Sequence, residues 1–325
     1  MAKGYRVNQF GGPEVMVWEA LNLSPLAPGA VRVRVGASGI NFAETRMRAG
    51  DYSGQELPFV MGMEVAGIVE QVGAEVSEFT AGDRVFGRVR GAHAEVVDCD
   101  PQHLMLLPDN LSFEQGAAIP VGWLTAWHAL YTVGGMQAGD RVLIEAVGGS
   151  VGSAALALAK QAGCWTLGTA SRDDKLAQAS TMGCDATVNY RNQSVSDQVS
   201  SLTGGEGMDI GLMTIGDATA DELIDSMGMD GRVVMFGSTG GRDITFNLRI
   251  GILNIQLLSM SISTSTAFTT RTMPDFREKA LPLFANGELV PVVDTVLPMS
   301  ELMRAHEMVD ERTHFGKVIL VNELN

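Results

Sequence analysis

Apolar residues alternate with polar ones in the first third of the chain and follow helical spacing in its middle. Alternating runs at residues 31–35, 64–69 and 83–86, separated by glycine turns, predict a β-rich unit over about residues 31–107. Beyond residue 110, strand-like runs alternate with helical segments, which is typical of a parallel sheet covered on both faces. Strands are predicted at 141–145, 165–168, 186–189, 210–213 and 232–236, and helices at 153–161, 173–182, 195–202 and 220–227. A helix before residue 285, a helix at 300–309 and a strand at 317–321 complete the pattern. The predicted fold class is therefore α/β.

Bulk properties narrow the functions that this chain can have. With 325 residues, of which 46% are hydrophobic, it can bury the cores of two domains. A net charge of -15 makes nucleic acid an unfavourable partner. No apolar stretch is long enough for a bilayer, and the N-terminus does not resemble a signal peptide. Three widely spaced cysteines, Cys99, Cys164 and Cys184, match neither a disulfide framework nor a zinc pattern, so a reducing cytoplasm is expected.

A glycine-rich segment follows the predicted strand 141–145 and opens a helix. This is where a pyrophosphate binds in nucleotide-binding βαβ units, because backbone N–H groups and the helix dipole point there and side chains are absent. Gly149 and Gly152 take the second and third places of a G-x-G-x-x-G pattern, while Val147 stands at the first. A turn that binds no ligand is the other interpretation. The predicted phosphate-binding residues are Gly148, Gly149, Ser150, Val151 and Gly152.

The choice between NADH and NADPH depends on the end of the next strand. An NAD enzyme places an acid there to accept from the ribose 2'-hydroxyl, and this sequence has none. Arg172 and Lys175, which share a helix face, could flank a 2'-phosphate, with Ser171 as a further donor. This favours NADPH. In the alternative interpretation Ser171 caps a helix, Asp173 and Asp174 suit its first turn, and the two cations are merely solvated.

The residues resemble a known family over essentially the whole chain. Matching motifs are Gly11–Val15, Gly39–Glu44, Arg48–Tyr52, Gly62–Val69, Gly82–Val85, Leu124–Trp127, Asn189–Arg191, Thr203–Gly205 and Gly316–Val318. On these motifs the chain resembles the zinc-independent quinone oxidoreductases of the medium-chain dehydrogenase/reductase superfamily.

The resemblance implies a domain organisation and an assembly. A GroES-like, β-rich catalytic domain, residues 1–120 and 265–325, would surround a Rossmann domain, residues 121–264, with a doubly wound parallel sheet that binds NADPH. The active site would occupy the cleft between the domains. A late strand within residues 255–263 would pair with its counterpart in a homodimer.

The zinc ligands of related dehydrogenases are missing. At the positions of a cysteine and a histidine ligand, this chain has Asn41 and Met63, followed by Glu64. An amide and a thioether beside one carboxylate cannot form a catalytic zinc site. Among the five histidines, which show no metal-binding pattern, only His93 is expected to reach the cleft, at a position where an aromatic residue is usual.

Further site residues follow from the resemblance. Asn41 would lie near the nicotinamide and the substrate, and Tyr52 would line the cleft. Lys175, Tyr190 and Arg312 match positions that hold the 2'-phosphate, and Asn247 matches a loop near the nicotinamide ribose. Thr125, Gly237 and Ser238 complete the predicted cofactor site. The chain also departs from the family pattern at Arg46, Ser150 and Met213.

The implied reaction is reduction of a quinone or an α,β-unsaturated carbonyl by hydride from NADPH. Tyr52 could donate a proton or hydrogen bond to the developing oxyanion, and Asn41 could act as a neutral donor. Solvent protonation, a packing role for Tyr52 and a structural role for Asn41 are the alternatives. Two other functions stay open: an enoyl-thioester reductase, and a non-catalytic NADPH-binding protein.

Overall fold

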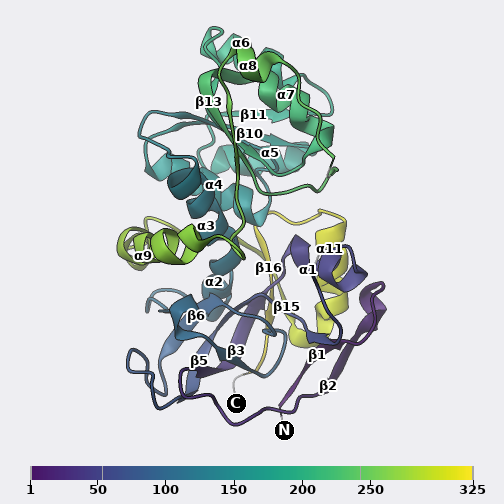
Figure 1. Cartoon of the computed structure of the whole chain (residues 1–325), viewed down its shortest axis with the longest axis vertical. Helices are drawn as coiled ribbons and strands as arrows, with labels where there is room; N and C mark the ends of the chain where they lie inside the picture. The colour runs from purple at the N-terminus through teal and green to yellow at the C-terminus, as the bar shows by residue number, and fades with distance from the viewer. Residues whose placement is uncertain (1, 53, 242, 324–325) are drawn as a thin grey trace. The chain divides into compact units, whose positions relative to one another are not determined.

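The computed structural model describes residues 2–52, 54–241 and 243–323, and these residues form two compact units (Figure 1). The first unit takes in both ends of the chain, residues 1–121 and 281–325, and the second spans residues 122–280. The first is rich in β-strands and the second contains a parallel sheet with intervening helices. The α/β fold class predicted from the sequence is confirmed.

The second unit is built on a six-stranded sheet in which every pair is parallel. Its spatial order, β11-β10-β9-β12-β13-β14, is the 3-2-1-4-5-6 order of doubly wound nucleotide-binding sheets. The strands are β9 (Arg141–Ile144), β10 (Trp165–Ala170), β11 (Ala186–Asn189), β12 (Met208–Met213), β13 (Met227–Met235) and β14 (Gln256–Ser259). The strand order reverses between β9 and β12, so a crevice for a ligand is expected where their carboxyl ends diverge.

Helices connect these strands because each crossover between parallel strands needs a long return. They are α4 (Ser150–Gln161), α5 (Asp173–Thr181), α6 (Val195–Thr203), α7 (Ala220–Asp225) and α8 (Arg249–Ile252). Before the first strand of the sheet lies α3 (Pro120–Trp127), and after the last lies α9 (Met273–Asp275). The helix predicted at 153–161 begins three residues earlier, since the glycine-rich turn leads straight into α4. A buried cluster that includes Leu143, Leu167, Val188, Val199 and Val233 forms one core of this unit.

The first unit contains a larger mixed sheet and a smaller three-stranded one. The larger sheet has the order β15-β16-β3-β5-β6-β8, with β7 paired to β3, and the smaller has the order β2-β1-β4. The strands of the larger sheet are β3 (Val31–Gly39), β5 (Glu64–Val72), β6 (Arg84–Arg88), β7 (Val96–Cys99), β8 (Leu104–Leu106), β15 (Val293–Pro298) and β16 (Lys317–Val321). The smaller sheet consists of β1 (Lys3–Val7), β2 (Met16–Ala20) and β4 (Phe59–Val60). The helices are α1 (Phe42–Ala49), α2 (Phe113–Ala117), α10 (Leu281–Ala285) and α11 (Leu302–Asp310).

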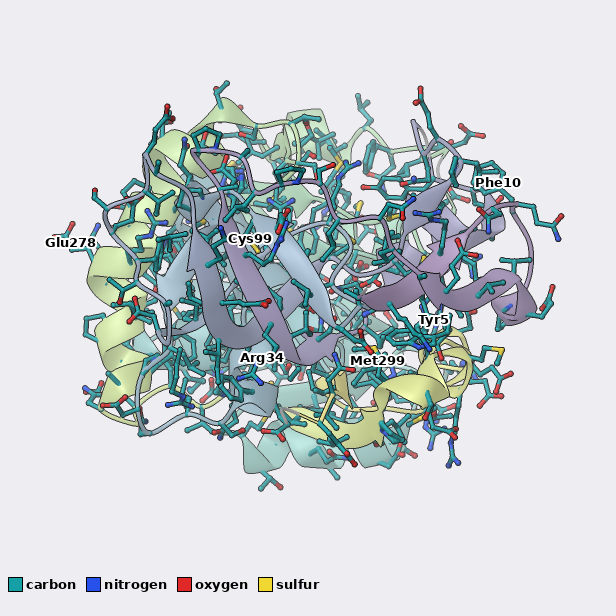
Figure 2. The ribbon with its side chains drawn as sticks, turned by 90° about the horizontal axis from the view of Figure 1, so that it is seen from below. Tyr5, Phe10, Arg34, Cys99, Glu278 and Met299 are labelled. Carbon is teal, nitrogen blue, oxygen red and sulfur yellow. The ribbon has the colours of Figure 1, made fainter. Side chains whose placement is uncertain are left out.

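The two ends of the chain share one core in the first unit. Tyr5 and Met299 belong to the same buried cluster, and the Tyr5 hydroxyl donates to the carbonyl oxygen of Ser300 at 3.2 Å. Figure 2 shows Tyr5 and Met299 close together. The C-terminal segment is therefore part of the β-rich unit and does not form a separate module.

The second boundary between the units differs from the expectation. Residues 265–280, which the sequence assigned to the β-rich domain, belong to the second unit. The Thr272 hydroxyl lies 2.6 Å from Nδ1 of His128 and 2.7 Å from the Thr132 hydroxyl, and Phe276 packs edge-on against Trp127 at 5.6 Å. These contacts with α3 and with the π-helix that follows it, His128–Val133, hold the segment in the second unit.

All three cysteines are free and buried. Among the described residues, every helix is either too short or too polar to cross a bilayer.

Candidate active site

The turn between β9 and α4 has the geometry of a phosphate-binding loop. Gly149 is the N-cap of α4, and its backbone N–H donates to the carbonyl of Ala146 at 2.8 Å. Gly152 lies so close to the turn that a Cβ there would collide with the carbonyl oxygen of Ala146 and would approach Val147 Cα to 2.8 Å. Only glycine allows this packing, as expected for the third position of the motif. The N–H groups at the start of α4 are available for an anion.

Five further predicted cofactor residues follow the carboxyl ends of parallel strands, which meet at one edge of the sheet. Ser171 and Arg172 follow β10, Tyr190 follows β11, and Gly237 and Ser238 follow β13. Lys175 lies in the first turn of α5, three residues after Arg172. The structure thus brings these residues to the same edge as the β9–α4 turn.

Arg172 has a partner of its own. Its Nε donates to Oδ1 of Asp174 at 3.0 Å and its Nη2 donates to Oδ2 at 2.7 Å. Arg172 is also the N-cap residue of α5, so the alternative in which Ser171 caps this helix is wrong. Asp173 and Asp174 do lie in the first turn, where the helix dipole favours acids.

Three predicted cofactor residues lie elsewhere. Thr125 is buried in α3, and Asn247 donates to Asp221 and Asp225 of α7 at 3.3 and 3.4 Å. Arg312 belongs to the first unit, where it follows α11 with a left-handed φ of 56°. Their roles at the cofactor stay predictions.

A buried carboxylate, Glu145, ties the phosphate-binding turn to the end of β12. Its Oε2 accepts from the backbone N–H groups of Thr214 at 2.7 Å and Ile215 at 2.9 Å, and its Oε1 accepts from the Thr219 hydroxyl. Burial raises the pKa of Glu145, although these three donors act in the opposite direction. A cavity of about 60 Å³ adjoins it, lined by Leu143, Glu145, Thr169, Tyr190, Val195, Ala218, Thr219, Glu222 and Leu223.

In the first unit, strand directions bring Asn41, Glu64 and Lys317 together. Because β3 runs antiparallel to both β5 and β16, its carboxyl end lies beside the starts of those two strands. Asn41 follows β3, while Glu64 begins β5 and Lys317 begins β16. The absence of a side chain at Gly39 provides space for the side chains of Glu64 and Lys317. A Cβ at this position would collide with the Glu64 carboxylate and come within 2.5 Å of Cε of Lys317.

Both the oxygen and the nitrogen of the Asn41 side-chain amide form hydrogen bonds. Its Oδ1 accepts from Lys317 Nζ at 2.6 Å, and its Nδ2 donates to Oε1 of Glu44 and to Oε1 of Glu64, each at 2.9 Å. Lys317 Nζ also forms an ion pair with Glu64, whose Oε2 accepts from the backbone N–H of Val121 at 2.7 Å. Both N–H bonds of the Asn41 amide are therefore used, so from a ligand this side chain can only accept.

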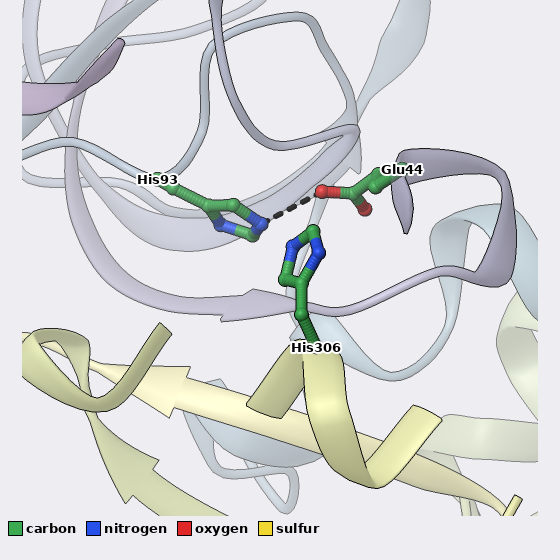
Figure 3. Close-up of side chains that lie close together, drawn as sticks. All are labelled: Glu44, His93 and His306. Carbon is green, nitrogen blue, oxygen red and sulfur yellow. Dashed lines mark hydrogen bonds and ion pairs between the residues drawn. The ribbon is translucent and has the colours of Figure 1, made fainter. Parts of the chain in front are cut away.

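Glu44 and His93 form a second buried pair beside this amide (Figure 3). His93 Nε2 lies 2.7 Å from Oε2 of Glu44, and its Nδ1 lies 2.8 Å from the Ser38 hydroxyl. That hydroxyl donates to the carbonyl of Glu64 at 2.9 Å, so it accepts from Nδ1–H of His93. A further proton then lies between His93 and Glu44. Burial opposes charge on Glu44, but the contacts with His93 and Asn41 lower the pKa of Glu44, which favours its carboxylate form.

His306 is the third member of this cluster, and its ring is neutral. Burial lowers the pKa of His306 to about 3, and its Nδ1 lies 3.5 Å from Nη1 of Arg48. Ligand atoms of Glu44, His93 and His306 lie within 4.8 Å of one another, a grouping that the spacing of the histidines did not indicate. His93 does not reach a cleft, because it is completely buried.

The cluster does not suit a metal ion. A structural zinc site has four protein ligands, and a catalytic site keeps one position open to solvent. Among the described residues this grouping has three members, all of them completely buried, and the Arg48 guanidinium lies beside it. We therefore interpret it as a buried hydrogen-bonded pair of Glu44 and His93 beside a neutral imidazole, that of His306.

Tyr52 follows α1 and is 39% exposed. The half-buried guanidinium of Arg88 lies near it: burial lowers the pKa of Arg88, while Glu64 and Tyr52 act in the opposite direction. Arg46, at a position where relatives carry a tyrosine, stacks over Phe42 at 5.1 Å and pairs with Asp310 at 2.7 Å. Arg88 thus interacts electrostatically both with the predicted catalytic tyrosine and with Glu64 of the buried network.

Comparisons with known proteins cover the whole chain. Residues 27–109 match the family model of the alcohol dehydrogenase GroES-like domain, and residues 150–286 match that of zinc-binding dehydrogenase. A human quinone oxidoreductase is 31% identical over 99% of this chain and 98% of that protein. The crystal structure of quinone oxidoreductase from Pseudomonas syringae superposes with a TM-score of 0.90 at 30% identity, covering 99% of this chain and all of that one. Escherichia coli quinone oxidoreductase complexed with NADPH gives 0.88 at 28% identity, with 99% and 100% coverage.

The buried ion pair predicts a large effect of Lys317→Met on stability. The substitution leaves the Glu64 carboxylate without its cation, which should lower the free energy of unfolding by about 3–5 kcal/mol. Lys279→Met is the control, because Lys279 is exposed and its pair with Asp275 should contribute less than about 1 kcal/mol. Denaturant unfolding measures both, and equal losses would contradict the role given to Lys317.

The raised pKa of Glu145 predicts a pH-dependent gain from Glu145→Gln. Glutamine can keep the contacts, with its carbonyl toward Thr214 and Ile215 and its amide toward Thr219. A carboxyl whose pKa is higher in the folded state contributes stability below its unfolded pKa and loses it as pH rises through the folded value.

The variant should therefore match the parent near pH 4 and exceed it by on the order of 1 kcal/mol at pH 8. Urea unfolding across this range tests the prediction, with the exposed Glu278→Gln as the control. A difference that stays constant with pH would show that burial does not control this carboxyl.

Proposed function

Because the chain belongs to the quinone oxidoreductase family, we propose that it reduces a quinone or an α,β-unsaturated carbonyl compound with hydride from NADPH and without a metal ion. The observation that carries the cofactor is the β9–α4 turn, in which Gly149 is the N-cap of α4 and Gly152 lets the start of the helix pack directly against the turn. Escherichia coli quinone oxidoreductase, which has the same fold, was crystallised with NADPH. The geometry of the turn and this related complex both support binding of NADPH by the second unit.

The residues of this unit suit each part of the cofactor. Gly148, Gly149, Ser150 and Val151, with Gly152, would hold the pyrophosphate through backbone N–H groups. Arg172 and Lys175, with Ser171 and Tyr190, would surround the 2'-phosphate, and Arg312 would join them. Thr125, Gly237, Ser238 and Asn247 would contact the nicotinamide half.

Bound NADPH would supply hydride from C4 of its nicotinamide. Two electrons and one proton would reach the acceptor as hydride, and a second proton would complete the hydroquinone or the saturated carbonyl. The Tyr52 hydroxyl is the proposed donor to the acceptor oxygen, which a Tyr52→Phe variant tests through kcat; solvent is the other source. Asn41 would accept from a ligand, because both of its N–H bonds are engaged.

The first unit supports a reaction without zinc. The Lys317 ammonium lies against both Asn41 and Glu64, two of the three residues at the positions where relatives carry metal ligands and the following acid. A divalent cation there would meet this positive charge. The free, buried cysteines fit a cytoplasmic enzyme.

Steady-state assays test the proposed function directly. Oxidation of NADPH with 1,4-benzoquinone, 9,10-phenanthrenequinone or a simple enone should exceed that of NADH and should be unchanged in EDTA. Arg172→Ala should raise KM for NADPH by about tenfold, because it removes a charged contact to the 2'-phosphate, and should leave KM for NADH unchanged. Turnover of crotonyl thioesters alone would favour an enoyl-thioester reductase, and tight NADPH binding without turnover would favour a binding protein.

The edge strand of the parallel sheet in the second unit supports a homodimer. Among the described residues, β14 pairs with β13 on one side only and is the end strand of its sheet. We propose that it pairs with β14 of a second copy, since an unpaired edge strand favours association. Light scattering should give the mass of a dimer, and Leu257→Pro, which removes a backbone donor, should shift it toward that of a monomer.

A further inference from the structure

Arg172, the cation that the proposed 2'-phosphate site needs, already forms a forked pair with Asp174. Two parallel hydrogen bonds, of 3.0 and 2.7 Å, join the guanidinium to the carboxylate. Both side chains are about half exposed, at 48% and 50%. The pair lies at the start of α5, directly after β10, where a ribose is expected.

A carboxylate and a phosphate compete for the same donors. The guanidinium fork matches either group, and both are bound through two parallel N–H bonds. Asp174 therefore presents to Arg172 the chemistry that a 2'-phosphate would present. A phosphate can take the fork only if Asp174 gives up one or both bonds.

The other charged residues at the start of α5 do not offset the competition between Asp174 and a phosphate for Arg172. Arg172 and Lys175 supply two positive charges, and Asp173 and Asp174 supply two negative ones, so the start of α5 has no net charge. The Asp173 carboxylate points to a different partner, since it accepts from Nδ2 of Asn189 at 2.6 Å. A phosphate ester with a charge near -1.5 to -2 thus meets two carboxylates, of which only Asp174 is bound to the arginine.

We infer that Asp174 is a specificity-determining residue, which weakens the preference for NADPH over NADH by competing with the 2'-phosphate for Arg172. This inference rests on the proposed function, because it assigns the start of α5 to the ribose. NADH lacks the phosphate and leaves the pair of Arg172 and Asp174 intact. The chain accordingly discriminates between the two cofactors less than Arg172 alone would allow.

Asp174→Asn is the informative variant, because it removes the charge and keeps the shape, including the acceptor for the backbone N–H of Lys175. Dissociation constants for NADPH and NADH, from fluorescence titration without an acceptor, separate binding from turnover. The variant should bind NADPH about three- to tenfold more tightly and NADH within about twofold of the parent. Weaker NADPH binding would overturn the inference, since it would mean that Asp174 orients Arg172 for the phosphate.

Two control experiments test whether Asp174 acts through its contact with Arg172. Asp173→Asn makes the same change in charge one residue away, and an equal gain there would reduce the effect to general electrostatics and overturn the inference. In an Arg172→Ala background, Asp174→Asn should give no gain, because the two residues act through one contact. A full gain in that background would also overturn it.

A failure of the proposed function would be seen in a different measurement, the binding of NADPH and NADH by the parent chain. A parent chain that binds only NADH would contradict NADPH as its cofactor. If Asp174→Asn then conferred NADPH binding, the inference would stand while the proposed cofactor would fall. Thermal unfolding of each variant verifies that it is folded.

Discussion

The need to pair every buried charge controls the architecture of the first unit. Lys317 is 1% exposed and lies 276 positions from Asn41, to which it donates, and it pairs with a completely buried Glu64. Breaking such a pair leaves an uncompensated ion, which costs several kcal/mol. The C-terminal strand β16 is therefore bound to the N-terminal sheet by more than its backbone ladder. The position of Asn41 depends on this pairing.

The same requirement extends through the neighbouring side chains. Lys317 pairs with Glu64, and Asp310 accepts from both Arg46 and Arg48. His306, with its lowered pKa, adds no charge. Paired charges are compatible with a buried site, whereas an unpaired charge would not be. His93 is engaged on both ring nitrogens, while among the described residues Nε2 of His306 has no hydrogen-bond partner.

Local patterns predicted more of the second unit than of the first. The glycines of the β9–α4 turn, and the strands that alternate with helices, are contiguous signals, and the observed sheet order follows from them. The convergence of Glu44, His93 and His306 has no such signal, because antiparallel pairing brings together residues that are far apart in sequence. Residues 265–280 were assigned to the wrong unit because a helical pattern does not reveal which core it packs against. The hydrogen bonds of Glu145 were not predicted either, because its partners lie beyond the next three strands of the chain.

The saturation of the buried network limits what the first unit can offer to a reacting molecule. Asn41 has both N–H bonds committed to carboxylates, and Glu64 accepts from Asn41, Lys317 and Val121. Negative charge that develops on an acceptor oxygen cannot be stabilised by the Asn41 amide unless one of its two N–H bonds to a carboxylate breaks. In the proposed reaction Tyr52, which is exposed and interacts electrostatically with Arg88, supplies that stabilisation. The network would then act as a support, and proton donation would pass to Tyr52 or to water.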